Sequence, residues 1–195
     1  MAGLRERKKE STRQAVEDAA LQLYRERGIH ETTIDELCAQ AGIARRTFFR
    51  YFSSKEDVLL ARMRVDIGTV EEAFRQAPPA EPLAALLTRA VDAVVADPAA
   101  FARFAGVVLA VPALRALYLG MLADFEDALR DLIARRLRIP PEGERARILA
   151  AAAVTGYRVG LEAWMAMEPR PDPGPVLRRT VTALVEPLTT VPAED

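Results

Sequence analysis

The most constraining feature of the sequence is a series of closely spaced helix start and stop signals in its first 56 residues. A serine or threonine followed three residues later by glutamate or glutamine predicts a helix start. The pattern occurs as Ser11 with Gln14, Thr33 with Glu36 and Ser53 with Glu56. Gly28 and Gly42 follow the first two apolar runs, where glycine commonly ends a helix. These signals predict helices over about 11–28, 33–42 and 45–52, followed by a longer helix that continues to Phe74.

The third of these helices has two chemically different faces. Phe48 and Phe52 are four residues apart, so they lie on one face and can pack against the preceding helices. Arg46, Thr47 and Arg50 project from the opposite side. A short helix, a glycine-containing turn and a second short helix form the pattern of a helix-turn-helix, whose second helix enters the DNA major groove.

The charge at the start of this third helix is unusual. Ala44 offers no side-chain oxygen to cap the helix, and Arg45 and Arg46 lie in a first turn whose N–H groups already carry positive partial charge. From Leu37 to Lys55 the chain has four basic residues and no acidic one, although its net charge is only −1. Such a cluster is either a solvated helix face or a surface that binds phosphates and bases. The helix-turn-helix pattern favours DNA, since an arginine can bond guanine O6 and N7 together.

The remaining sequence has helical periodicity throughout and no alternating strand pattern. Prolines at 78, 79 and 82 separate the first part of the chain from five further helices, expected at about 82–96, 98–110, 112–138, 143–168 and 174–190. A hydrophobic content of 50% over 195 residues suffices for a buried core. We therefore predict an all-α protein of about nine helices, with a three-helix DNA-binding head in 1–53 and a six-helix body in 54–195.

Composition argues against several classes of protein. Cys38 and His30 are the only cysteine and histidine, and no metal-ligand or phosphate-loop spacing is present, so we expect no catalytic residue, metal site or cofactor. No uncharged apolar run reaches the roughly 18 residues of a membrane span, and no signal-peptide pattern precedes the first helix. These features predict a cytoplasmic protein that is not an enzyme and has no membrane partner. The basic residues near the start form either a DNA-binding arm or a solvated terminus: Arg5, Arg7, Lys8, Lys9 and Arg13.

The stretch TTIDELCAQAGIARRTFFRYFSSKEDVL, residues 32–59, resembles the signature of tetracycline-repressor (TetR) family regulators. The resemblance implies phosphate or base contacts through eight residues: Thr33, Arg45, Arg46, Thr47, Phe49, Arg50, Tyr51 and Lys55. Thr33, Tyr51 and Lys55 match positions that bind the DNA backbone. Ala44 departs from the usual capping serine or threonine, and Phe49 and Arg50 replace the common tyrosine and histidine, so no operator sequence is implied. The octet RRTFFRYF also resembles mycofactocin-system regulators, some of which respond to acyl-CoA thioesters.

For the body, the resemblance implies an effector pocket and a two-fold dimer. The candidate pocket residues are large and mostly apolar, which fits a plain core equally well: Phe101, Phe104, Val108, Tyr118, Met121, Leu122, Phe125, Tyr157 and Trp164. Arg103, Arg115 and Arg158 either bind an anionic part of the ligand or extend to solvent. Small residues at 150–153, Gly156 and Gly160 permit close approach of a helix, either from the same chain or from a second copy.

The resulting prediction is a homodimeric, ligand-responsive transcriptional repressor. It binds a near-palindromic double-stranded DNA operator and is released by a largely apolar small molecule. The family uses its last two helices for the dimer interface, which favours the second copy as the partner of the small residues. The alternatives are an architectural DNA-binding protein without ligand control and an all-helical enzyme.

Overall fold

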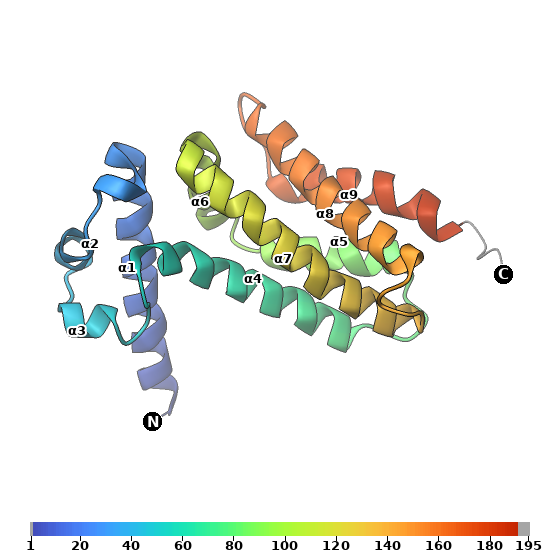
Figure 1. Cartoon of the computed structure of the whole chain (residues 1–195), viewed down its shortest axis with the longest axis horizontal. Helices are drawn as coiled ribbons and strands as arrows, with labels where there is room; N and C mark the ends of the chain where they lie inside the picture. Colours follow the sequence, from blue (N-terminus) through green and yellow to red (C-terminus); the bar gives the residue numbers. More distant parts are fainter. Residues whose placement is uncertain (1, 191–195) are drawn as a thin grey trace. The chain divides into compact units, whose positions relative to one another are not determined.

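The computed structural model describes residues 2–190, and within that range the chain forms nine helices and no strand (Figure 1). The helices are α1 (Ala2–Glu31), α2 (Ile34–Gln40), α3 (Arg45–Phe48), α4 (Lys55–Gln76), α5 (Leu83–Val94), α6 (Pro98–Ala110), α7 (Pro112–Leu137), α8 (Glu144–Met165) and α9 (Pro173–Thr190). The all-α prediction is confirmed. The five predicted body helices agree with α5–α9 to within three residues at each end, because prolines and glycines mark most of those ends.

Helix α1 begins earlier than the sequence pattern predicts. It starts at Ala2, so Ser11 lies inside the helix and the predicted Ser11–Gln14 capping box is wrong. Serine and glutamine are tolerated inside a helix, and the preceding residues are mostly good helix formers. The predicted stop is confirmed at Gly28, where φ is +82° and ψ is 165° and the helical path is interrupted.

Helix α3 is shorter than the expected 45–52. Its last residue is Phe48, after which the N–H groups of Arg50 and Tyr51 bond three residues back, to the carbonyls of Thr47 and Phe48. Such bonds tighten the end of a helix into 3₁₀-type turns. Thr47 and the aromatic residues after it have low helix propensity, and Ala44 supplies no side-chain cap, so nothing local lengthens the helix.

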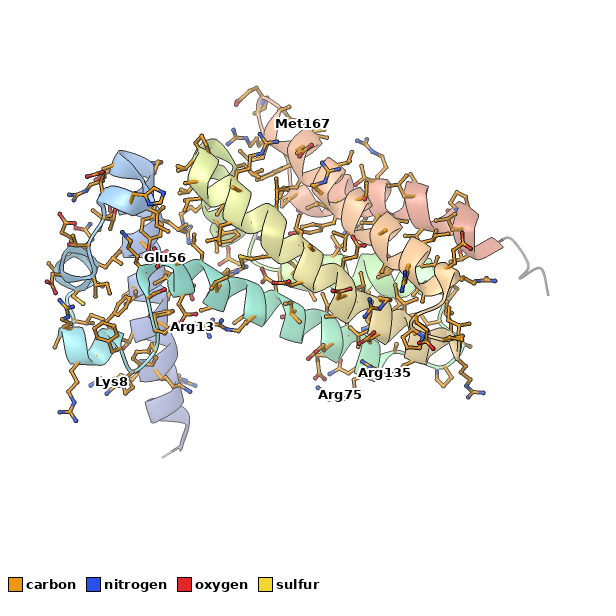
Figure 2. All side chains as sticks on the ribbon, in the orientation of Figure 1. Lys8, Arg13, Glu56, Arg75, Arg135 and Met167 are labelled. Carbon is orange, nitrogen blue, oxygen red and sulfur yellow. The ribbon has the colours of Figure 1, made fainter. Side chains whose placement is uncertain are left out.

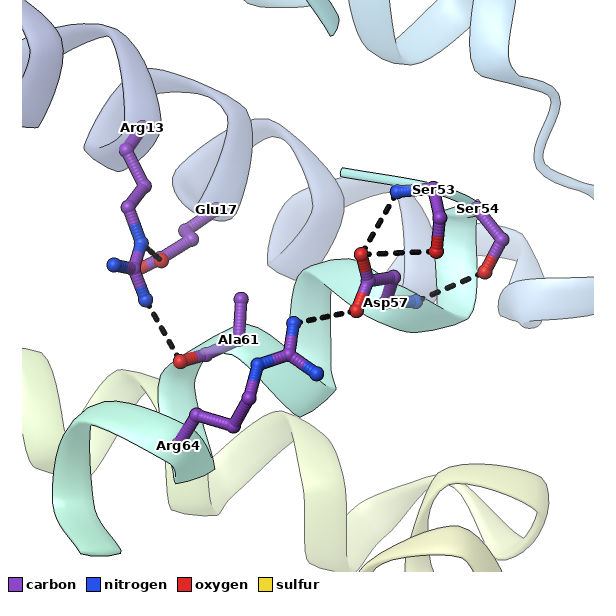
Figure 3. A network of polar contacts seen from close by, with 7 residues as sticks. All are labelled: Arg13, Glu17, Ser53, Ser54, Asp57, Ala61 and Arg64. Atoms are coloured by element: carbon purple, nitrogen blue, oxygen red, sulfur yellow. Dashed lines mark hydrogen bonds and ion pairs between the residues drawn. The ribbon is translucent and has the colours of Figure 1, made fainter. Parts of the chain in front are cut away.

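The cap of α4 lies one residue later than predicted (Figure 3). The N–H of Asp57 donates to Ser54 Oγ at 3.1 Å, and Asp57 Oδ2 accepts from the N–H and the hydroxyl of Ser53 at 2.8 and 3.1 Å. The Ser53–Glu56 capping box is therefore wrong in register. Two adjacent serines each have an acidic residue three positions later, and this local pattern does not distinguish the two registers.

The chain divides into two compact units. One consists of residues up to Val65 together with Arg103–Tyr118, and the other of Asp66–Ala102 together with residues from Leu119 onward. In the first unit α2 packs against α1 and α3. Its core includes four fully buried large side chains, Tyr24, Leu37, Phe48 and Phe52. In the second unit α9 packs against α8 and α5, with α8 and α9 side by side (Figure 1).

Two glycines explain the close contact between α8 and α9. A Cβ atom at Gly156 would lie 2.8 Å from the Cα of Val181, and one at Gly160 would lie 3.1 Å from the Cα of Leu177. Helix α9 can therefore approach only because neither position has a side chain. These two small residues serve packing within the chain, which was one of the two alternatives open from the sequence.

We expect Gly156→Ala to lower the stability of the protein. Its methyl group would collide with the backbone of α9 at Val181, and such overpacking costs roughly 1–3 kcal/mol. The better helix propensity of alanine offsets at most about 1 kcal/mol of that. Gly120→Ala in α7 is the control, because a Cβ there has no neighbour within 4 Å and we expect stabilisation. Urea unfolding measures both, and equal midpoints for the two variants would contradict the packing argument.

Candidate nucleic-acid interface

The interface begins at the first turn of α2, which is capped as the sequence predicts. Thr33 Oγ1 accepts from the N–H of Glu36 at 3.3 Å, and Glu36 Oε2 accepts from the N–H of Thr33 at 2.9 Å. Bonds from the Thr33 backbone and hydroxyl, together with the charge and bonds of Arg27, lower the pKa of Glu36. Thr33 is exposed, but its donors are engaged by Glu36. A phosphate at Thr33 would therefore compete with that carboxylate.

The turn between α2 and α3 and the core beneath it orient the basic residues. Gly42 has φ +65°, a left-handed conformation that glycine adopts without strain. Phe48 and Phe52 are buried, with ring centroids 5.5 Å apart. Because these two rings hold one side of residues 45–52 against the core, the other side faces outward. The exposed residues are Arg45, Arg46, Phe49 and Arg50, while Thr47 and Tyr51 are half-buried.

Arg45 has an acidic partner that the local sequence pattern did not reveal. Its Nη1 atom donates to both carboxylate oxygens of Asp35, at 2.8 and 3.0 Å. Its guanidinium carbon lies 5.6 Å from the ring centroid of Phe49. The carboxylate partly offsets the unfavourable positive charge in the first turn of α3. Arg50 similarly lies over the ring of Tyr51, at 4.9 Å, and donates to its hydroxyl at 3.2 Å.

Lys55 has a structural role that sequence reasoning missed. Its ammonium donates to the carbonyls of His30 at 3.0 Å and Thr32 at 2.8 Å, and its own carbonyl accepts from the Tyr24 hydroxyl at 2.6 Å. Burial, followed by the charge of Glu56, raises the pKa of Tyr24. An ammonium group has three donors, so one is left beyond these two bonds. Only the three-dimensional structure could show these contacts, because the partners are 23 and 25 residues away.

We expect Lys55→Ala to destabilise the protein as well as to affect DNA binding. Removing the ammonium leaves the carbonyl of buried Thr32 without that donor, which costs roughly 1–3 kcal/mol. Lys8→Ala is the matched control, because Lys8 is exposed on α1 (Figure 2). Thermal unfolding compares the two. Identical transition temperatures would show that the contacts of Lys55 contribute little to folding.

A network of polar contacts joins α1 to α4 (Figure 3). Arg13 donates from Nη2 to the carbonyl of Ala61 at 2.7 Å and from Nε to Glu17 at 3.0 Å. Arg13 is thus held within the protein and does not belong to a free basic arm. The side chain of Arg5 lies outside the described residues, and Arg7, Lys8 and Lys9 are exposed on α1.

Asp57 is the acidic centre of a separate set of polar contacts at the start of α4 (Figure 3). Arg64 donates to it at 2.6 Å. Burial is the largest single influence on its pKa and raises it, but the bonds from Arg64 and Ser53 outweigh burial and leave the pKa lowered. A carboxylate with a lowered folded-state pKa stabilises the fold above its unfolded value of about 3.9, and this contribution is lost as the pH falls further. The cap of α4 therefore weakens in acid.

The candidate effector residues fall into both compact units. Phe104, Val108 and Tyr118 belong to the first unit, and the other six, Phe101, Met121, Leu122, Phe125, Tyr157 and Trp164, belong to the second. Phe104, Phe125 and Tyr157 are half-buried, while the rest are buried. The structure brings the rings of Phe101 and Trp164 together at 5.8 Å. Trp164 Nε1 also donates to the carbonyl of Pro171 at 2.7 Å.

The three arginines considered for an anionic ligand differ in their surroundings. Arg103 and Arg115 are exposed, whereas Arg158 is half-buried and donates to Glu162 one helical turn away at 3.1 Å. Arg62, which the sequence did not single out, lies over the ring of Phe104 at 6.0 Å from its centroid. A cation on the face of an aromatic ring is stabilised by the quadrupole of the ring.

Within the described part of the chain, no group of three or more histidine, cysteine or acidic side chains is placed to hold a metal ion. Cys38 is buried, and burial, with the charge of Asp35, raises the pKa of its thiol. No single described helix is long and apolar enough to cross a membrane, and only α5 with α6, bent by 87° at their junction, meets the length and composition criteria as a pair.

Comparison with known proteins gives matches along most of the chain. Residues 17–61 match the family described as bacterial regulatory proteins, tetR family, and residues 78–189 match the MftR C-terminal domain. The transcriptional regulator TcmR of Streptomyces glaucescens is 30% identical over 177 residues, which cover 83% of this chain and 76% of TcmR. The match to the MftR domain agrees with the resemblance of the RRTFFRYF octet to mycofactocin-system regulators.

Solved structures share the fold at lower identity. FadR from Bacillus subtilis, in complex with stearoyl-CoA, is 22% identical and aligns with a TM-score of 0.59 over 88% of this chain and 97% of FadR. SmeT in complex with triclosan is also 22% identical, with a TM-score of 0.59 over 94% of this chain and 96% of SmeT. Both likenesses support the arrangement of helices described above.

Proposed function

The chain belongs to the TetR family of DNA-binding bacterial regulators, and from this premise we propose that it is a homodimeric repressor released from a near-palindromic DNA operator by a small molecule. In this proposal residues 1–53 bind DNA, and residues 54–195 bind the effector and form the dimer. Its partners are double-stranded DNA, a largely apolar effector and a second copy of the chain. It acts in the cytoplasm, without a cofactor, a membrane partner or an enzymatic activity.

The observation that carries the proposal is the outward-facing basic surface of α3 and the turn after it. Arg45, Arg46 and Arg50 are exposed there, while Phe48 and Phe52 are buried behind them. An arginine in the major groove can bond guanine O6 and N7 together, and arginine and lysine also neutralise phosphates. Two copies related by a two-fold axis present two such surfaces to successive major grooves, which favours a palindromic site.

Contacts to the DNA backbone complete the proposed interface. Lys55 has one donor beyond those bonded to His30 and Thr32, and it lies at the start of α4, where N–H groups favour an anion. Thr33 is exposed, and Tyr51 is half-buried beside Arg50. Together with Thr47 and Phe49, these side chains give each head both base and phosphate contacts, the combination that specific DNA binding uses.

The composition of the nine candidate residues supports a largely apolar effector. Six of them carry aromatic rings, the other three are aliphatic or methionine, and Trp164 and Phe101 are in ring contact. FadR and SmeT have been solved with stearoyl-CoA and triclosan, both of which contain large apolar parts. The MftR-type match over residues 78–189 makes an acyl thioester a reasonable first class of compound to test.

The homodimer is supported by apolar side chains that remain exposed on the last two helices. They are Ile148 and Val159 on α8, at 44% and 41% exposure, and Leu184 and Leu188 on α9, at 40% and 37%. Residues 148, 152, 155 and 159 follow helical spacing along one stripe of α8. Gly156 and Gly160 already face α9 of the same chain, so a second copy would use the neighbouring stripe of α8.

Selection of bound duplexes from a random DNA pool tests the proposal. We expect one near-palindromic sequence, bound with an affinity that falls steeply with salt. Candidate effectors are then tested for release from that site, with the fluorescence of Trp164 as a report from the body. Weak binding with no sequence preference and no releasing ligand would favour an architectural DNA-binding protein. If the chain shows no salt-dependent DNA binding, the proposal is refuted and the all-helical enzyme is the alternative that remains.

A further inference from the structure

Arg45 differs from Arg46 and Arg50, the other exposed arginines of this surface, because a carboxylate bonds to its guanidinium. Both bonds to Asp35 use the same nitrogen, Nη1, and the ring of Phe49 lies against the guanidinium at 5.6 Å. The two neighbours come from α2 and from the turn after α3. The side chains of Arg45 and Asp35 are nevertheless 60% and 71% exposed, so this arrangement lies at the protein surface.

The position of Asp35 determines which part of the guanidinium it leaves available. A guanidinium has five N–H donors in a planar fork. Both bonds to Asp35 start from Nη1, whereas Nε and Nη2 form a separate two-donor edge that Asp35 does not use. That edge can donate two parallel bonds to one acceptor pair, and guanine offers such a pair, O6 and N7, in the major groove.

The charge of Asp35 also changes what Arg45 attracts. A carboxylate at 2.8 Å nearly cancels the field of the guanidinium at longer range and repels a phosphate that approaches the same group. Bonding to a guanine is affected less, because O6 and N7 are neutral acceptors. Asp35 therefore favours recognition of a base over attraction to the DNA backbone.

We propose that Asp35 and Phe49 are positioning residues that present the Nε–Nη2 edge of Arg45 to a guanine and thereby increase discrimination between specific and random DNA. The inference rests on the proposed function, since it requires that α3 enters the major groove. The inference adds Asp35 of α2, which lies outside α3 and the turn after it, to the residues that determine DNA sequence specificity. An acidic side chain that weakens total DNA attraction is consistent with this role.

Asp35→Asn tests the inference, with Glu31→Gln as the control. Glu31 is an exposed carboxylate of the same unit, so the two variants change the net charge equally. The DNA is the operator selected by the wild-type chain, the same operator with single guanines replaced by 7-deazaguanine, which lacks N7, and a random duplex. Arg45→Ala identifies the guanine that Arg45 contacts, because that variant should lose the preference for guanine over 7-deazaguanine at that one position only. Affinities are compared at two salt concentrations.

We expect the wild-type chain to bind the operator about 10-fold better than its 7-deazaguanine form at that position. Asp35→Asn should reduce this ratio to about 2-fold and raise the affinity for random duplex several-fold at low salt. Phe49→Leu should reduce the ratio without the gain on random DNA. Glu31→Gln should keep the wild-type ratio. If Asp35→Asn has a normal unfolding temperature and keeps the wild-type affinity ratio, the inference about Asp35 is overturned but the proposed function is not. If the wild-type chain selects no DNA sequence, the proposed function itself is overturned.

Discussion

Ile148→Glu and Val159→Glu are each expected to give folded monomers whose affinity for the operator is reduced at least about 100-fold. Both residues are more than 40% exposed in the single chain, so a charged side chain there does not enter its core. In the proposed dimer the same positions meet the second copy, where an unpaired carboxylate loses its hydration and disfavours association. A monomer reaches one half-site only, and it loses the effective concentration, commonly millimolar, that links the two binding events.

Sedimentation at micromolar protein and anisotropy of labelled operator measure the two effects. Leu119→Glu is the control, since Leu119 is also 41% exposed but lies on α7. We expect that variant to remain a dimer. A dimeric, DNA-binding Ile148→Glu protein would move the interface away from this stripe of α8. Point variants are preferable to removing α9, because Leu177 and Val185 are fully buried and their loss would unfold the chain.

The parts of the fold predicted correctly are those where several local signals agree. Helices α5 to α9 end within three residues of the predicted positions, and in most cases a proline or glycine marks the boundary. The Thr33–Glu36 box is confirmed, because the glutamate side chain accepts from the Thr33 N–H while the threonine hydroxyl accepts from the Glu36 N–H. Residues that only permit a helix start are less informative. Ser11 and Gln14 fit a helix interior equally well, and Ser53 and Ser54 offer two registers for one cap.

Contacts between distant residues account for what the sequence could not predict in the candidate site. Nothing near Arg45 in the chain is acidic, yet Asp35, ten residues earlier, reaches it once α2 and α3 pack together. Lys55 resembles a free phosphate-binding residue in the sequence, but it bonds to one carbonyl in the last turn of α1 and to another just before α2. The spacing of Gly156 and Gly160 indicates that a helix approaches closely there, and only the structure identifies that helix as α9.

Replacing Arg46 should separate DNA recognition from folding. Arg46 is exposed in the first turn of α3, where a positive charge is unfavourable, so Arg46→Ala should leave the unfolding free energy unchanged or slightly higher. If Arg46 bonds a base, operator binding should weaken by about 1–3 kcal/mol, with a smaller effect on random DNA. Arg135→Ala, an exposed arginine in the last turn of α7, removes the same charge as a control. Ala44→Ser should meanwhile stabilise α3 by about 0.5–2 kcal/mol, because serine supplies the missing cap. Wild-type operator affinity and salt dependence in folded, dimeric Arg46→Ala would show that this arginine is part of a solvated face.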